Sequence, residues 1–212
     1  MRLIKRLFKN LKQVEGIGLL EMIIALGVII TGVIGGLTLA INNLISISTN
    51  DSRLVAANLA REAVEVIRNK RDSNWLNNAL WYEGILQDPD NNYRLITFFE
   101  VGSNSWQFND QTQDIENCDE CRLYYHAGSG AISHDPSADP EVSLTSYKRL
   151  VTLRQICWHE EIGSQTILSE GQKCEDDPDL EWIGWQVNTE VRWQGAGRTH
   201  RVELEDHLYN WR

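Results

Sequence analysis

Four cysteines are the residues of this chain with the most distinctive chemistry. Cys118 and Cys121 form a C-x-x-C pair, and Cys157 and Cys174 enclose a longer loop. Such a set can form disulfides, act as a redox pair or bind zinc. A redox pair needs a thioredoxin-like context and zinc usually needs a second close pair, and neither is evident. The economical pairing is 118–121 with 157–174, but the sequence permits three connectivities, and unpaired thiols or a metal stay as alternatives.

Histidines and acidic loops are the other groups that could do chemistry. The five histidines, at positions 126, 134, 159, 200 and 207, are scattered and show no H-x-x-x-H spacing. The acidic runs 88–92 and 176–179 offer oxygen ligands but lack the central glycine and distal glutamate of an EF-hand loop. Solvated turns are therefore expected there, with calcium as the alternative. We see no phosphate-binding glycine loop, nucleophile elbow or paired catalytic acids, and we expect no enzyme activity, no cofactor and no metal site.

The distribution of charge along the chain indicates a membrane-spanning segment near the N-terminus. Residues 1–15 hold five cations and one anion, whereas residues 16–50 hold one charge, Glu21. The apolar run 17–41 is long enough to cross a bilayer at about 1.5 Å per residue. The basic segment before it, without a similar cluster after it, predicts an N-terminus inside and the rest of the chain outside. Disulfides can form on that outer side.

Glu21 lies inside the apolar run, where a carboxylate costs a few kcal/mol and needs a partner. The run is too long for a secretory signal and no small-x-small cleavage site follows it. The stretch 15–21, EGIGLLE, resembles the class III signal of type IV prepilins, which has a basic leader, a glycine, a hydrophobic residue and a glutamate at the fifth mature position. The resemblance implies cleavage between Gly16 and Ile17 by a prepilin peptidase and N-methylation of Ile17. The family more often has Phe or Met at that first position, so Ile17 suits an accessory subunit.

The anchor also contains features suited to assembly. Cleavage would create an ammonium group on Ile17, and Glu21 of a neighbouring subunit could pair with it. The alternative is that Glu21 reaches to the membrane interface. Gly32, Gly35 and Gly36 lie further along the run and include a G-x-x-x-G pair. They predict close helix packing or local loosening, with ordinary membrane-helix glycines as the alternative.

Beyond the anchor, residues 50–71 predict an amphipathic helix that ends at 72–74, before a possible short helix at 76–80. Residues 102–120 are polar and are expected to be irregular. Strands are expected at 93–101, 122–126, 131–134, 147–158, 185–193 and 198–204. The fold class is therefore α+β, a long N-terminal helix packed on an antiparallel sheet, as in the pilin fold. Three tryptophans, Trp182, Trp185 and Trp193, are expected mostly in the core, with a binding face as the alternative.

These segments predict four regions: a leader at 1–16, a transmembrane and polymerisation helix at 17–41, a stem helix at 42–72 and a β-rich head at 73–212. The net charge is −10, and the chain without residues 1–16 has 15 cations and 29 anions, a net charge of −14. Such acidity argues against binding duplex DNA, because phosphates would be repelled.

The favoured function is a minor pilin or pseudopilin, a structural subunit of a type IV pilus or of a related type II secretion or DNA-uptake filament. The partners that this implies are other pilin subunits, the prepilin peptidase and methyltransferase, and an inner-membrane assembly platform. The expected location is a single-pass membrane protein with an external head, which reaches the cell surface once assembled. The alternatives are a tip adhesin or other module on such a filament that binds DNA or a surface ligand, and an unrelated membrane-anchored external domain such as an enzyme or sensor.

Overall fold

The computed structural model describes residues 18–87, 93–100, 103–136, 141–195 and 197–210, which fall into two compact units, 1–48 and 49–212. One helix, α2 (Leu19–Leu76), contributes residues to both units. The described residues of the second unit then form eight strands: β1 (Arg94–Glu100), β2 (Ser105–Asp110), β3 (Arg122–His126), β4 (Ala131–Ser133), β5 (Val142–His159), β6 (Ser164–Ile167), β7 (Leu180–Gly195) and β8 (Arg198–Tyr209). The fold is α+β, as the sequence predicts.

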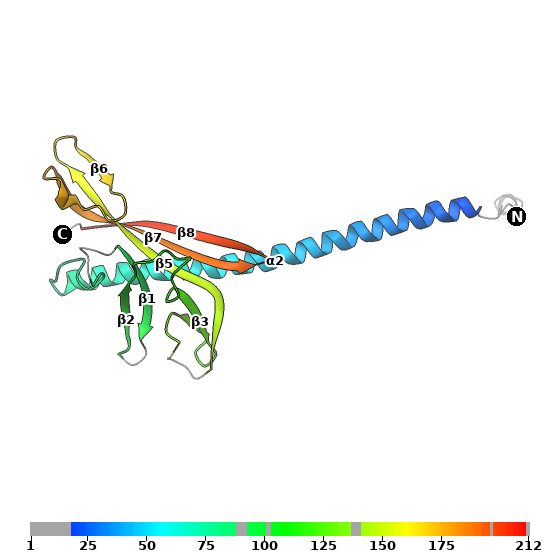
Figure 1. Ribbon diagram of the computed structural model, residues 1–212, viewed down its shortest axis with the longest axis horizontal. Coiled ribbons are helices and arrows are strands. Elements are labelled where there is room, and N and C mark those ends of the chain that lie inside the picture. The colour runs from blue at the N-terminus through cyan, green and yellow to red at the C-terminus, as the bar shows by residue number, and fades with distance from the viewer. Residues whose placement is uncertain (1–17, 88–92, 101–102, 137–140, 196, 211–212) are drawn as a thin grey trace, which may run out of the picture. The chain divides into compact units, whose positions relative to one another are not determined.

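The long strand β5 organises the sheet, and all pairings between the described strands are antiparallel. One edge of β5 pairs with β7 over most of its length, and β7 pairs with β8. The other edge pairs in turn with β3, β1 and β6, because each residue of β5 has room for only one neighbour on that side. Figure 1 shows β5, β7 and β8 as long strands, with the shorter β1, β2 and β3 beside β5. The hairpin of β7 and β8 confirms the one expected at residues 185–204 and extends further.

The stem part of α2 packs on one face of this sheet. Its apolar positions recur every three or four residues, which places them on one side of the helix. The expected amphipathic pattern is confirmed by burial, and Trp185 and Trp193 are buried beneath it while Trp182 is partly buried. The buried apolar residues of α2 are Ala56, Leu59, Ala60, Ala63, Val64, Val66, Ile67 and Trp75.

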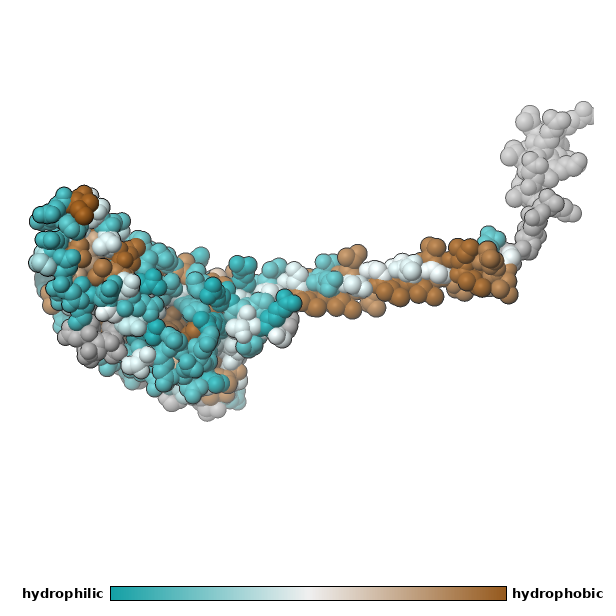
Figure 2. Space-filling view, turned by 45° about the horizontal axis from the view of Figure 1, so that its top comes forward, coloured by the Kyte–Doolittle hydropathy of each residue, from teal (hydrophilic) through white to brown (hydrophobic). Residues whose placement is uncertain are grey.

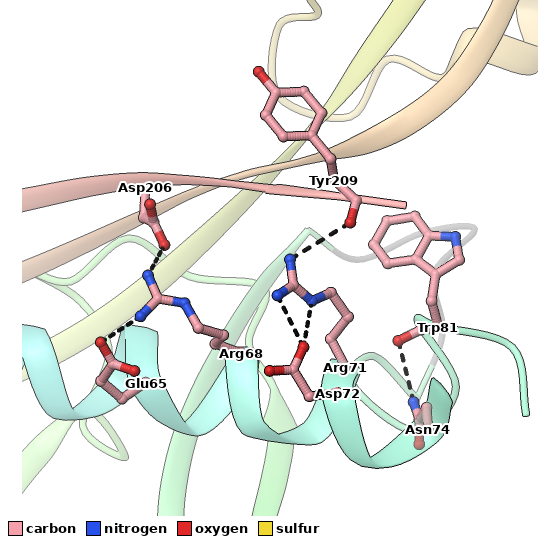
Figure 3. A network of polar contacts seen from close by, with 8 residues as sticks. All are labelled: Glu65, Arg68, Arg71, Asp72, Asn74, Trp81, Asp206 and Tyr209. Carbon is pink, nitrogen blue, oxygen red and sulfur yellow. Dashed lines mark hydrogen bonds and ion pairs between the residues drawn. The ribbon is translucent and has the colours of Figure 1, made fainter. Parts of the chain in front are cut away.

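The end predicted for this helix, at residues 72–74, is wrong, because α2 continues to Leu76. Asn74 is buried, and its side-chain amide donates hydrogen bonds to the carbonyls of Trp81 (3.2 Å) and Glu83 (2.8 Å). These bonds satisfy Asn74 inside the helix, so its usual tendency to end helices is not expressed. Figure 3 shows this contact beside two arginines of α2 that reach β8, Arg68 with Asp206 and Arg71 with the carbonyl of Tyr209.

Three further expectations differ from the structure. The short helix at 76–80 is replaced by a turn in which Asn78 has a positive φ of 56°. The segment expected to be irregular, 102–120, contains β2, which forms a hairpin with β1. Strand β6, which was not expected, pairs with the far end of β5. The described residues of β2 and β6 are mostly exposed or half-buried, so burial of an apolar face contributes little to these strands, and pairing with β1 and β5 supplies their order.

Arg149 is a buried cation between α2 and the sheet, and only 1% of its side chain is exposed. Its guanidinium donates to the carbonyls of Leu59 (3.0 Å) in α2 and Thr97 (2.7 Å) in β1, and it lies 3.3 Å from the Glu62 carboxylate. Burial lowers the pKa of Arg149, and Glu62 opposes that effect. The residue therefore ties three elements together through one planar group.

Candidate functional site

The apolar segment of α2 in the first unit is unusual because its large side chains face outward. By length and composition it can cross a membrane, and it lies near the N-terminus. In a water-soluble unit so much exposed apolar surface would be unfavourable, at about 25 cal/mol for each Å². The exposed large apolar residues of this segment are Leu19, Leu20, Met22, Ile23, Ile24, Leu26, Val28, Ile29, Ile30, Val33, Ile34, Leu37, Leu39, Ile41, Leu44, Ile45 and Ile47.

Glu21 lies in the first turn of this helix. Its backbone N–H donates to the carbonyl of Gly18 at 2.9 Å, so the residue is inside the helix rather than before it. Its side chain is exposed, and no described residue gives it a hydrogen bond or an ion pair. The helix dipole favours a carboxylate near a helix N-terminus. In an apolar medium, however, the negative charge remains unfavourable unless an opposite charge pairs with it. Gly16 and Ile17 lie outside the described residues.

The helical geometry divides this segment into two unlike faces. At 3.6 residues per turn, a sector about 100° wide holds mostly small or polar residues. Figure 2 shows brown side chains along one edge of this helix and paler ones along the other. The small or polar sector holds Glu21, Ala25, Gly32, Gly35, Gly36 and Asn43, with Val28 and Leu39 as its bulky members. The rest of the circumference is mostly bulky and includes Leu19, Met22, Ile23, Leu26, Ile29, Ile30, Val33, Ile34, Leu37, Ile41, Leu44 and Ile47.

The glycines of this face are not required by packing within the described chain. A Cβ added at Gly32, Gly35 or Gly36 would meet nothing within 4 Å. Each lies inside a regular helix, where glycine costs about 1 kcal/mol relative to alanine. Thr31 and Thr38 satisfy their hydroxyls by donating to carbonyls one turn earlier, as polar side chains do in an apolar medium. The glycines therefore leave space on the same sector as Glu21.

The cysteines, in the second unit, form two disulfides. Cys118–Cys121 lies in a small cluster with Ile96, Ile115 and Leu150, and Cys157–Cys174 joins β5 to the short 3-10 helix η2 (Cys174–Asp176). These are the bonds of the economical pairing. All four cysteines are buried, so they act as structural links between loops and strands.

The other candidate ligands do not converge. Among the described residues no three His, Cys, Asp or Glu side chains are placed to hold a metal ion. In the acidic run 176–179 the carboxylates of Asp176 and Asp177 accept backbone N–H groups of their own turn, and the run 88–92 lies outside the described residues. His134 is buried, and its Nδ1 lies 3.1 Å from each of two carbonyls, so this nitrogen carries the proton. Burial, and secondarily the charge of Arg149, lower the pKa of His134 to about 3.

A set of cations that the sequence analysis did not single out is assembled by strand pairing. Arg122 in β3 is directly opposite Lys148 in β5, which is opposite Arg192 in β7, which is opposite Arg201 in β8. We call these four residues the basic row. They lie on the sheet face away from α2, because Arg149, the next residue of β5, points to the helix. Only the register of four strands reveals them, since the four residues are far apart in the sequence.

Comparison with protein-family models, with curated proteins and with solved structures finds no match for this chain. The interpretation of the apolar helix and of the head therefore rests on the residues and geometry described above.

Proposed function

We propose that this chain is a minor pilin or pseudopilin, a structural subunit of a type IV filament or of a related secretion or DNA-uptake filament. A prepilin peptidase cleaves it after Gly16, and the apolar part of α2 then leaves the membrane to pack among neighbouring subunits. The head stays outside the cytoplasmic membrane. The observation that carries this proposal is Glu21, an exposed carboxylate without a partner among the described residues, in the first turn of an apolar helix.

The physical reason for assembly is the pairing of two charges that the apolar medium isolates. A charge inside a membrane costs about 2.5–3.5 kcal/mol at the centre of a helix on insertion scales, and less near its end. The amine of Ile17, created by cleavage, is the complementary charge. A neighbouring subunit, displaced along the filament axis, brings its own amine to Glu21, so the pair sets both attraction and axial register.

The face that carries Glu21 supports the proposal. Gly32, Gly35 and Gly36 share its sector, so another helix can approach closely there and exchange lipid contacts for helix contacts. Bulky side chains cover most of the remaining circumference, which suits lipid or a looser apolar contact. A simple membrane anchor requires neither a carboxylate nor a glycine-lined sector, and this favours a filament subunit over an anchored enzyme or sensor.

Mass spectrometry of the mature N-terminus tests the processing step. The chain is expressed in cells with and without an active prepilin peptidase. The expected product begins at methylated Ile17 only where the peptidase is active. Persistence of residues 1–16 beside an active peptidase that processes its other substrates contradicts the proposal.

A pair of substitutions tests the role of the carboxylate. Glu21→Ala is expected to leave cleavage intact and to reduce incorporation into sheared filaments by about tenfold or more, since a loss of about 1.4 kcal/mol is tenfold in an equilibrium constant. Met22→Ala, on the bulky sector one residue away, is the matched control and should incorporate nearly normally. Equal incorporation of both variants removes the charge-pairing argument.

A further inference from the structure

The basic row borders a cavity in the second unit that the filament proposal leaves unused. The cavity measures about 440 Å³, within the range of small-molecule sites. Three members of the row, Arg122, Lys148 and Arg192, line it, and Glu116 is the one acidic residue among the described residues that line it. Asp119 pairs with Arg122, and Glu116 and Glu190 pair with Arg192, so Lys148 is the lining cation that no described carboxylate compensates.

Lys148 is the cation with the least compensation. Its ammonium donates to the backbone carbonyls of Ile115 (3.1 Å) and Glu116 (2.9 Å), and no described carboxylate forms an ion pair with it. These two bonds use two of its three N–H donors and hold it in place. Like charges on directly paired strands destabilise a sheet, so placing Lys148 opposite both Arg122 and Arg192 has a cost that folding alone does not require.

The two arginines beside it also keep free donors. Arg192 uses Nε for Glu190 and one terminal nitrogen for Glu116, at 2.5 Å, and no described group accepts from its other terminal nitrogen. Arg122 uses Nε and one terminal nitrogen for Asp119. Three cations from three strands thus keep unused N–H groups while they line one cavity, and charge-assisted N–H groups of this kind bind carboxylates.

The carboxylate of Glu116, which belongs to the chain itself, lies at the cavity and pairs with Arg192. Three quarters of its side chain is exposed, so its contact with Arg192 is an open ion pair that a ligand can displace. Neutral groups complete the rim. The Ser146 hydroxyl has no described partner, and Thr199 accepts a hydrogen bond from Gln194 at 2.7 Å, which leaves its own O–H free to donate.

We propose that this cavity binds a small carboxylate that also carries hydroxyl groups, such as a hexuronate, through Lys148 and the two arginines, with the hydroxyls held by the neutral rim. A nucleic acid fits the site less well. The next residues along β7 and β8 on the same face are Glu190 and Glu203, so a row of acids lies beside the basic row and would repel a phosphate chain that extended across the sheet. The proposal is independent of the filament function.

Isothermal titration calorimetry on the full chain in detergent micelles, at low salt, tests the site with glucuronate as the probe. Glucuronate should bind at least about tenfold more tightly than glucose, because the carboxylate supplies charge-assisted hydrogen bonds. Lys148→Met should weaken glucuronate binding by about tenfold or more. Arg201→Gln is the matched control: it removes the member of the basic row that does not line the cavity, and binding should change by less than about twofold.

Glu116→Gln keeps the proposal testable if loss of Lys148 disturbs the fold. It removes the internal competitor, so glucuronate should bind more tightly, by roughly threefold or more, and a gain cannot come from unfolding. The absence of binding to the unmodified chain overturns the proposal. So do equal losses in Lys148→Met and Arg201→Gln, equal binding of glucose, or a short DNA duplex that competes at the same residues.

Discussion

Arg149 allows a sharp test of how the head is held together, because it is a charge buried between a helix and a sheet. Arg149→Lys keeps the charge but places it on one nitrogen, which cannot reach the carbonyls of Leu59 and Thr97 and the carboxylate of Glu62 together. Arg149→Met removes the charge and the hydrogen bonds at once while keeping much of the apolar stem. The two variants therefore separate the value of the bonds from the cost of burying the charge.

The expected magnitudes follow from the contacts. Lysine loses two of the three charge-assisted bonds, each about 1.5–3 kcal/mol, while its charge stays buried, so Arg149→Lys should lower the free energy of unfolding by about 3–5 kcal/mol. Methionine loses all three bonds but also the desolvation cost of the charge, and Leu59 keeps its helical hydrogen bond. Arg149→Met should therefore cost only about 1–3 kcal/mol. The conservative change is expected to be the more damaging one.

Urea unfolding of the full chain in detergent micelles, followed by tryptophan fluorescence, measures both values. Arg68 is the matched control, because its side chain is about one third exposed and pairs with Glu65 and Asp206 at the surface of the same helix. Both substitutions at Arg68 should cost less than about 1 kcal/mol. If Arg149→Lys is as stable as the unmodified chain, or more stable than Arg149→Met, then the site is hydrated and the reasoning is refuted.

Three other outcomes are expected of the head. The pKa of His134 is lowered from 6.5 to about 3, so between these values the unfolded chain binds a proton that the folded chain does not. The free energy of unfolding should therefore fall by about 1.4 kcal/mol per pH unit as the pH drops from 6.5 toward 3. Unfolding of His134→Gln, followed across this range, should lack that contribution. Removing the Cys157–Cys174 disulfide, with 17 residues of separation, should cost about 1.5 kcal/mol more than removing Cys118–Cys121, with 3, and thermal or urea unfolding of the two double alanine variants checks the order. Gly184→Ala should lower the free energy of unfolding by about 1–3 kcal/mol, because its Cβ would lie 2.5 Å from a carbonyl oxygen of β8, whereas alanine at Gly197 meets only a positive φ.

Several features of the fold could be predicted because their signals are local. The amphipathic stem is encoded by apolar residues three and four positions apart, and the β7–β8 hairpin by alternation on both sides of a glycine-containing turn. Elements stabilised mainly by neighbours were missed. Strand β2 is a short stretch within a polar segment, and its pairing with β1 stabilises it. Asn74, which ordinarily favours the end of a helix, is held inside α2 by carbonyls of the following turn.

Glu21, near the N-terminus, could be identified from the sequence, whereas the charged clusters of the head could not. A charge within an apolar run is visible in the sequence, because its cost depends on composition along one helix, and Glu21 was therefore identified without any coordinates. The basic row and Arg149 could not be identified in that way. Arg122, Lys148 and Arg192 become neighbours only through the register of β3, β5 and β7, and a shift of one residue would turn each to the opposite face of the sheet. The sequence by itself determined the long apolar segment and the amphipathic helix that follows it, because both signals lie along one helix, whereas tertiary pairing decided which charges meet.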